Sequence, residues 1–212
     1  MTTPQERKRA ERDARRRRIQ GAARPIFGER GFAATSIEQI ARQAEMSVGA
    51  IYLYFQSKED LYVSLLPESL APLEAALVEV RGNRADDRLT RAWAQLLAWS
   101  RTEVEGARTL GLLARPGLVT QLSTESAEAA VAAIGRVKEQ LAGAIADGIE
   151  AHTYRQADPA AVAELVWSAF LGGLDLDLVA ANLNQPTTDR SALIAVIEAS
   201  LRADLTSMRR AA

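Results

Sequence analysis

The chain has 212 residues, 48% of them hydrophobic and 25% charged, which is enough for one large domain or for a small domain joined to a larger one. It contains no cysteine, which excludes disulfides, thiol catalysis and cysteine-ligated metals. Its one histidine, His152, argues against histidine-based metal sites and catalytic triads. No apolar run reaches the length needed to cross a bilayer, and no signal-peptide core follows the arginine-rich start, so we expect no membrane span and a reducing, cytoplasmic location.

The net charge of −1 conceals an asymmetry along the chain. Residues 1–58 hold 12 Lys and Arg against 6 Asp and Glu, a charge of +6, and residues 59–212 therefore carry −7. A positive segment suits binding to a polyanion, and an acidic remainder limits nonspecific adhesion to it. A solvated charged helix explains the basic arm at 7–18 equally well, so the arm favours nucleic acid only in combination with the helices C-terminal to it.

Helical periodicity begins directly after the arm. The apolar stripe of a first helix consists of Ile19, Ala22, Ala23, Ile26 and Phe27. Pro25 lies within this pattern and is expected to bend the helix or loosen its last turns, because it lacks an amide hydrogen. Gly28 and Gly31 bracket the exit from the helix.

A short second helix is predicted over residues 36–44. Thr35 and Glu38 have the spacing of a capping box, with the Thr35 hydroxyl as the cap and Glu38 reaching back. The free amides at this helix start suit a DNA phosphate. The side chains expected to face the core are those of Ile37, Ile40, Ala41 and Ala44.

A tight turn at Glu45 and Met46 leads into a third helix, which Ser47 is expected to cap. Ile51 and Phe55, four residues apart, should anchor this helix in the core. The side chains that remain for a DNA-facing surface are those of Val48, Gly49, Ala50, Tyr52 and Tyr54. A basic arm, a short helix, a tight turn and a second short helix occur in the order of a helix-turn-helix, whose second helix enters the DNA major groove. Core tyrosines and caps are common, so the joint order and spacing carry this inference.

Ser57 is expected to cap a fourth helix. Lys58 lies in its first turn, where a cation opposes the helix dipole. A DNA phosphate close to Lys58 would account for a cation in this position.

The segment over residues 31–61 resembles the N-terminal domain of the TetR family of transcriptional regulators. It reads GFAATSIEQIARQAEMSVGAIYLYFQSKEDL, and the likeness extends over about residues 14–66. Beyond it the resemblance is one of length and helical pattern. The family is bacterial, all-helical and dimeric, and most members repress genes until a small ligand binds the C-terminal domain.

The resemblance implies roles for individual residues of the helix-turn-helix. Places that contact phosphate in the family are matched by Thr35, Ser36, Tyr54 and Lys58. The groove-facing part of the recognition helix is matched by Ser47, Val48, Gly49, Ala50 and Tyr52. A further contact from the second helix is expected from Arg42.

Three positions depart from the family pattern. Glu45 stands where a turn glycine is usual, and it costs roughly 1 kcal/mol if the left-handed conformation is kept. Val48 replaces a frequent Lys and Ala50 a frequent Thr, so this helix lacks the long bidentate donors that read guanine or adenine. We expect Val48 and Ala50 to contact thymine methyl groups. Specificity then rests on Tyr52, Arg42, the arm or DNA shape.

The whole chain is predicted to be all-α, with a three-helix helix-turn-helix domain at 1–60 and a larger helical effector-binding and dimerisation domain at 61–212. The larger part has breaks at 81–84, 115–117, 154–159 and 182–188. No repeat or low-complexity linker separates the two domains, so we expect the fourth helix to join them. A packed helix moves as a unit and can carry a signal.

The last two predicted helices, at about 159–182 and 189–208, are expected to form a homodimer surface. In the family the corresponding helices make a four-helix bundle across a two-fold axis, and two heads read two half-sites. An ordinary helical core explains the same apolar pattern. The interface residues we expect are Val162, Val166, Ala169, Phe170, Gly173, Leu193, Ile197 and Leu201.

A ligand pocket is expected by analogy with the family's central cavity. Its candidate walls are Trp93, Trp99, Leu110, Leu113, Trp167 and Leu171. Core packing explains each tryptophan equally well. Few charged residues fall on the apolar faces, so we expect a neutral or apolar effector, with a polar contact from Arg101, Arg108 or Glu103.

These features favour a homodimeric repressor of a partly palindromic double-stranded operator, relieved by a small hydrophobic effector. The alternative is a transcription factor, such as an activator, that responds to a protein or to no ligand at all. An enzyme is not expected, because no phosphate-binding glycine loop, nucleophile–base pair or metal-ligand cluster is visible. Asp175 and Asp177 lie two residues apart on a helix and point to different sides. We expect neither a cofactor nor a metal.

Overall fold

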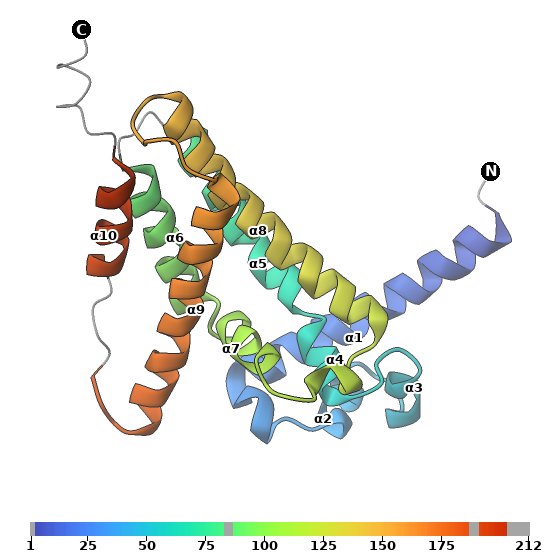
Figure 1. Cartoon of the computed structure of the whole chain (residues 1–212). Helices are drawn as coiled ribbons and strands as arrows, with labels where there is room; N and C mark the ends of the chain where they lie inside the picture. Colours follow the sequence, from blue (N-terminus) through green and yellow to red (C-terminus); the bar gives the residue numbers. More distant parts are fainter. Residues whose placement is uncertain (1–2, 83–86, 187–190, 203–212) are drawn as a thin grey trace, which may run out of the picture. The chain divides into compact units, whose positions relative to one another are not determined.

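The computed structural model describes residues 3–82, 87–186 and 191–202, and all of its named elements are helices, as expected (Figure 1). The chain forms two compact units. Unit 1 consists of Met1–Glu68 and Val104–Val131, and unit 2 of Ser69–Glu103 and Ala132–Ala212. The single boundary expected at residue 60 therefore differs from this division, because residues 104–131 pack with the N-terminal helices.

Unit 1 is built around the first helix, which contacts α2, α4 and α7. Its elements are α1 (Pro4–Ala34), α2 (Ile37–Gln43), α3 (Val48–Tyr52), α4 (Lys58–Val63), α7 (Val104–Leu113) and the 3-10 turn η1 (Leu118–Gln121). The first residues of α5 (Leu66–Gly82) and of α8 (Thr124–Glu150) also belong to it. Its largest fully buried side chains include Ile19, Phe27, Ile40, Ile51, Phe55 and Tyr62.

The first helix is interrupted at Gly31 and not at Pro25. Gly31 has φ 72° and ψ 169°, and it is the residue of α1 whose backbone angles are not helical. Only glycine adopts such a conformation at little cost, because it has no Cβ. The bend predicted at Pro25 thus falls six residues later, where glycine permits it. Of the expected stripe, Ile26 is half-buried and the other four side chains are buried.

Tyr62 connects α4 to α7 within unit 1. Its hydroxyl donates to Glu105 Oε2 at 2.6 Å, and the ring packs on Phe27 and Phe32 with centroids 4.8 and 5.0 Å away. Burial, together with the hydrogen bond to Glu105, raises the pKa of Tyr62 above its usual value. The tyrosine is therefore neutral at physiological pH and remains a hydrogen-bond donor.

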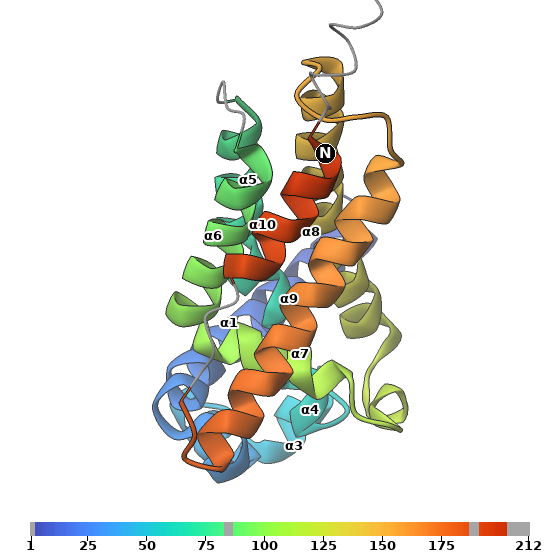
Figure 2. The same cartoon turned by 60° about the vertical axis from the view of Figure 1, so that its left-hand side comes forward.

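Unit 2 contains most of α5 and α8 together with α6 (Arg88–Thr102), α9 (Pro159–Asn182) and α10 (Ser191–Leu201) (Figure 2). Helix α6 contacts both α9 and α10. An aromatic cluster lies where these helices meet. Phe170 is its centre, with ring centroids 6.3 Å from Trp93, 6.3 Å from Trp99 and 5.6 Å from Trp167. Both Trp93 and Trp99 are buried, so α6 is covered on two of its faces.

A buried carboxylate attaches α10 to the rest of unit 2. Glu198 is 3% exposed and accepts hydrogen bonds from the Thr90 hydroxyl and, at 2.8 Å, from the Tyr154 hydroxyl. Burial and the bond to Glu198 raise the pKa of Tyr154. The Tyr154 oxygen also accepts from the Leu89 amide at 3.3 Å. These contacts link the start of α6, the loop after α8 and α10.

One stretch, Lys58–Gly82, is long and apolar enough to span a membrane by length and composition. This corrects the expectation that no such run exists. The stretch covers α4 and α5, and its side chains at Leu61, Leu66, Leu70, Leu73 and Leu77 are buried inside the protein. Burial in a protein core accounts for their apolar character.

Candidate nucleic-acid interface

Helix α2 begins at a cap one residue later than expected. The Ser36 hydroxyl accepts from the Gln39 amide at 3.4 Å, and the Gln39 side chain accepts from the Ser36 amide at 2.9 Å. This is a complete capping box, so the predicted pair of Thr35 and Glu38 is wrong. A hydrogen bond from the Ser36 hydroxyl, and then one from its own backbone amide, holds the pKa of Glu38 below its usual value.

Thr35 is not an outward-facing residue. It is 2% exposed, and its hydroxyl donates to the Gly31 carbonyl at 2.8 Å. The side chain thus satisfies a carbonyl freed by the interruption of α1. A phosphate contact through this hydroxyl, as the family pattern implied, does not agree with its position. Ser36 is half-buried at the helix start.

The turn between α2 and α3 keeps the family's left-handed geometry without its glycine. Glu45 has φ 53°, and the Met46 amide donates to the Ala41 carbonyl at 2.9 Å. The strain expected for Glu45 is therefore present. Its carboxylate lies 2.7 Å from Arg18 on α1, although both side chains are largely exposed. An exposed pair of this kind stabilises the turn only weakly.

The recognition helix α3 is positioned as the sequence predicts. Ser47 is its N-cap and accepts from the Ala50 amide at 3.1 Å. Ile51 and Phe55 are 0% and 1% exposed, so both are core anchors. This anchoring determines which face of α3 remains outside.

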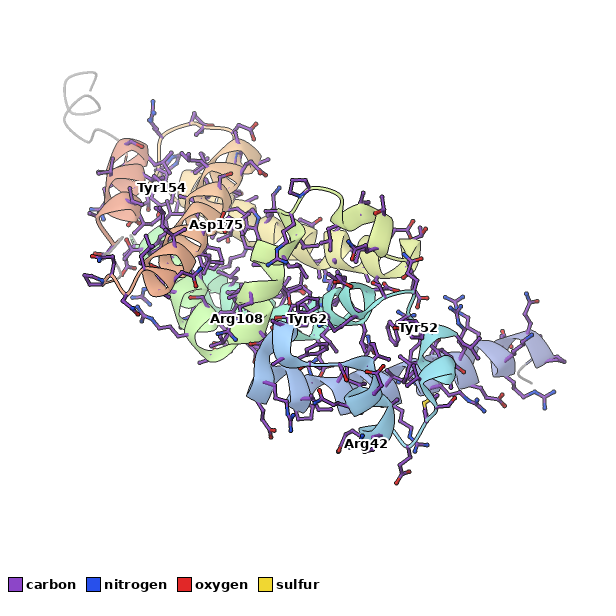
Figure 3. All side chains as sticks on the ribbon, turned by 90° about the horizontal axis from the view of Figure 1, so that it is seen from below. Arg42, Tyr52, Tyr62, Arg108, Tyr154 and Asp175 are labelled. Atoms are coloured by element: carbon purple, nitrogen blue, oxygen red, sulfur yellow. The ribbon has the colours of Figure 1, made fainter. Side chains whose placement is uncertain are left out.

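The outer face of α3 carries small side chains and one aromatic ring. Val48 and Ala50 are half-buried, Gly49 is exposed and Tyr52 is 51% exposed. Arg42 is exposed on α2, and Figure 3 shows it and Tyr52 on the neighbouring helices α2 and α3 of unit 1. Small side chains allow the backbone of α3 to lie close to a DNA groove. The longer side chains of Tyr52 and Arg42 can extend to the base edges.

Two residues expected to contact phosphate have contacts inside unit 1. The Lys58 Nζ donates to the Phe32 and Thr35 carbonyls, both at 2.9 Å, and lies 4.3 Å from the Phe32 ring centroid. These acceptors explain a cation in the first turn of α4, and one of the three ammonium hydrogens is left for another acceptor. Tyr54 is half-buried, and its carbonyl accepts from Arg16 at 2.5 Å.

A groove of about 970 Å³ lies between the basic arm and the end of α3. The arm is helical, with Thr3 as the N-cap of α1 in a capping box with Glu6. The groove is lined by Leu53 and Tyr54, by four cations of the arm (Lys8, Arg9, Arg12 and Arg15) and by four carboxylates (Glu6, Glu11, Asp13 and Glu125). These charges balance, so the groove as a whole does not favour an anionic chain.

Asp60 is the residue of this region that sequence reasoning missed. It is 0% exposed, and its Oδ1 accepts from the Ser123 amide at 3.1 Å and the Ser123 hydroxyl at 2.9 Å. Its Oδ2 accepts from the Gln56 amide at 2.9 Å. The local signal, an acid three residues after the Ser57 cap, was visible in the sequence. The partner 63 residues away was not.

The six expected pocket walls are divided between the units. Leu110 and Leu113 are on α7 in unit 1, whereas the other four belong to unit 2. Trp93, Trp99 and Trp167 are buried in the aromatic cluster, and Leu171, the residue after Phe170, is half-buried. The expected set is therefore not a single cluster within one unit.

Half of the expected dimer residues face the interior of unit 2. Val166, Phe170 and Leu201 are 0%, 1% and 4% exposed, and Gly173 is also buried, so these four residues lie in the core of unit 2. Helix α9 has two apolar faces, and this one packs on its own unit. Val162, Ala169 and Ile197 are half-buried, while Leu193 is 48% exposed.

The outward apolar stripe of α9 is a different set of residues. They recur at spacings of three, four and seven residues and so share one helix face. Val196 on α10 is also exposed. The stripe consists of Leu165, Gly172, Leu176, Val179 and Leu183.

Known proteins resemble both parts of the chain. The family model described as "Bacterial regulatory proteins, tetR family" matches residues 19–65, and the one described as "Tetracyclin repressor-like, C-terminal domain" matches residues 85–195. The HTH-type transcriptional regulator HbdR of Aromatoleum sp. (strain CIB) is 42% identical over 62 residues, which cover 29% of this chain and only 27% of that protein.

Solved structures of known proteins have a similar fold over most of the chain. The MbdR regulator from Azoarcus sp. CIB has a TM-score of 0.63 and 24% identity, covering 88% of this chain and 98% of that one. The regulator FadR from Bacillus subtilis, solved in complex with stearoyl-CoA, has a TM-score of 0.63 and 19% identity, covering 89% and 98%. These two likenesses concern the fold. Because one family model alone matches more than half of its length, the chain belongs to the TetR family of bacterial transcriptional regulators.

Proposed function

We propose that this chain binds a partly palindromic DNA operator as a homodimer, represses transcription from it, and is released by a small, largely apolar effector. Its family consists of transcriptional regulators and not of enzymes. The observation that carries DNA binding is the outer face of α3, where Ser47, Gly49 and Tyr52 are exposed on a helix anchored from behind by Ile51 and Phe55. The protein is proposed to act in the cytoplasm, where its DNA target lies.

The experiment that tests operator binding is a selection of bound duplexes from a random DNA pool at about physiological salt. We expect an enriched inverted repeat, because two identical heads related by a two-fold axis read two half-sites. Binding that vanishes as salt rises, with no enriched sequence, would leave only nonspecific attraction to the basic arm.

Base reading is proposed to rest on apolar contacts from Val48 and Ala50 and on polar contacts from Tyr52 and Arg42. Val48 and Ala50 reach only a short way from the helix, which suits thymine methyl groups. Val48→Ala should lower the affinity for operators that carry thymine at the contacted position about fivefold and leave the affinity for other operators unchanged. Equal affinity of the variant for every operator would exclude the methyl contact.

Homodimerisation is proposed through the outward stripe of α9, which a second copy would cover across a two-fold axis. Leu165, Leu176 and Leu183 are 53%, 60% and 65% exposed, so the stripe is an apolar surface without a cover in one chain. Leu176→Arg should convert the dimer to a monomer in sedimentation velocity and greatly reduce operator affinity. Val119→Arg, at a site on η1 that is 72% exposed, is the matched control and should remain dimeric.

The effector is proposed to bind beside the aromatic cluster of unit 2. The buried indole N–H of Trp93 has no hydrogen-bond partner within the described residues, whereas that of Trp99 donates to the Ser69 carbonyl at 2.7 Å. A buried donor without a partner is costly, so an apolar ligand with one acceptor suits this place. FadR, of the same fold, was solved with stearoyl-CoA. Only the acyl chain of stearoyl-CoA is apolar, since its coenzyme A part is charged. Stearoyl-CoA is thus the first molecule to test for operator release, with coenzyme A, which lacks the acyl chain, as control and Trp93→Phe as the variant that should respond less.

A further inference from the structure

Arg16 on α1 holds the end of the recognition helix from inside unit 1. It is 6% exposed, and its Nη1 donates to the Tyr54 carbonyl at 2.5 Å. The guanidinium carbon lies 4.3 Å from the ring centroid of Phe55. The planar guanidinium thus contacts both Tyr54 and Phe55, the residues through which the chain leaves α3.

The remaining edge of this guanidinium is occupied by Glu125, in the first turn of α8. Arg16 Nε lies 3.0 Å from Glu125 Oε1, and Arg12 lies 3.6 Å from the other carboxylate oxygen. A buried cation needs such a partner, because an uncompensated charge in the interior is costly. The position of Glu125 therefore constrains Arg16, and Arg16 constrains the end of α3.

The start of α8 is fixed to α4 at two more points. Ser123 caps α8 by accepting from the Ser126 amide at 3.2 Å, and the same Ser123 is held by Asp60. The Ser57 hydroxyl donates to the Gln121 carbonyl at 2.7 Å. A displacement of the first turn of α8 must therefore act on the helix-turn-helix.

Helix α8 continues from unit 1 into unit 2, with residues 124–131 in the first and 132–150 in the second. Within unit 2 its side chains at Val137, Leu141 and Ile145 are fully buried. A helix packed along its length moves as a unit. The sequence had led us to expect a connection through the fourth helix and did not indicate one through α8.

We propose that Arg16 is a positioning residue for the recognition helix and that its ion pair with Glu125 couples operator binding to unit 2 through α8. This rests on the proposed operator binding. When DNA engages α3, the exit of α3 at Tyr54 and Phe55 is held in one arrangement, and Arg16 transmits that arrangement to Glu125. Coupling between two sites is reciprocal, so a change imposed on unit 2 alters operator affinity by the same contact.

The tryptophans make this coupling measurable without an effector. The chain has 3 of them, and Trp93, Trp99 and Trp167 all lie in unit 2. The experiment titrates the full-length protein with the duplex enriched in the selection, labelled for anisotropy, and records tryptophan emission of the same samples. Anisotropy reports binding to unit 1, and emission reports the response of unit 2.

We expect operator binding to change the tryptophan emission of the unaltered protein. Glu125→Gln, which keeps the size of a side chain that is 50% exposed, should lose about half or more of that change while operator affinity falls less than about tenfold. Glu128→Gln, on an exposed site of the next turn of α8, is the control and should retain the full change. Arg16→Lys, which keeps the charge but not the planar fork, should resemble Glu125→Gln.

The outcomes separate the two proposals. A failure to enrich any duplex would remove the proposed function and this inference with it. Specific binding with no change in emission in the unaltered protein, or a full change in Glu125→Gln, would overturn the coupling alone. Loss of the emission change in Glu128→Gln as well would show that the effect comes from charge on α8 in general and would also overturn it.

Discussion

In unit 1 the buried charged side chains of Asp60 and Arg16 join distant segments, whereas in unit 2 the helices meet around an aromatic cluster and the buried carboxylate of Glu198. Asp60 and Arg16 are 0% and 6% exposed, and each joins segments far apart in the sequence. In unit 2 Phe170 contacts three tryptophans instead. Buried polar contacts specify direction and partner, while apolar contacts specify mainly volume. The helix-turn-helix of unit 1 is thus held by specific polar contacts, whereas the centre of unit 2 is held mainly by the packing of aromatic rings.

The largest expected loss of stability comes from disrupting the aromatic cluster of unit 2. Phe170→Ala removes the ring at the centre of the cluster and leaves a cavity, so the free energy of unfolding should fall by about 3–5 kcal/mol. Urea denaturation measures it. Val78→Ala, at a residue of α5 that is 51% exposed, should change stability by only about 0.5 kcal/mol. Equal losses in both would mean that the cluster is not the core of unit 2.

A smaller effect is expected on the polar side. Asp60→Ala leaves the amides of Gln56 and Ser123 without an acceptor, which should lower the unfolding free energy by about 2–3 kcal/mol. Glu29→Ala, on an exposed site of α1, is the comparison variant and should change little. A stable Asp60→Ala protein would show that water can replace this carboxylate and that the polar interior is not specific.

Lys58 tests a single polar contact between helices. Lys58→Met keeps most of the stem over Phe32 but removes both hydrogen bonds to the end of α1, for an expected loss of about 1–2 kcal/mol in thermal unfolding. Operator affinity should fall about equally for all sequences, since the residue reads no base. If only operator affinity changes and stability does not, the phosphate role predicted from the sequence is the main one.

The smallest effect concerns the turn. Glu45→Gly removes the strain of a left-handed backbone at a residue with a side chain. It also removes the exposed contact with Arg18 and raises the conformational entropy of the unfolded chain, and both of these changes lower stability. The free energy of unfolding should therefore rise by only about 0.5 kcal/mol. Glu38→Gly, in the right-handed backbone of α2, should instead lose about 1 kcal/mol. Differential scanning calorimetry of the two variants distinguishes local backbone strain from a general effect of glycine.

Local rules predicted what depends on neighbours in the sequence. The Ser47 cap and the anchors Ile51 and Phe55 follow from spacing alone, and both are confirmed. The left-handed turn at Glu45 follows from the family resemblance, and the structure has it. The cap of α2 was displaced by one residue, because Thr35 and Ser36 are both good caps and only the break at Gly31 decides between them.

Contacts between distant segments could not be predicted in this way. Nothing in periodicity pairs Asp60 with Ser123 or Arg16 with Glu125, since hydrogen-bond partners depend on the folded arrangement. Helix α9 shows a related limit. Both of its faces are apolar, so the pattern could not tell Val166 and Phe170, which face the core, from Leu176 and Leu183, which do not.

The division of unit 1 into two chain segments matters for anyone who exchanges DNA-reading parts between regulators. A chimera cut just after residue 60 would transplant Arg16 and Asp60 but would leave their partners Glu125 and Ser123 behind with the recipient. A graft of this kind therefore needs three crossovers, after residues 68, 103 and 131, so that residues 104–131 travel with residues 1–68. The portable reading module of this protein is discontinuous, and its natural cloning boundaries are not those of an N-terminal fragment.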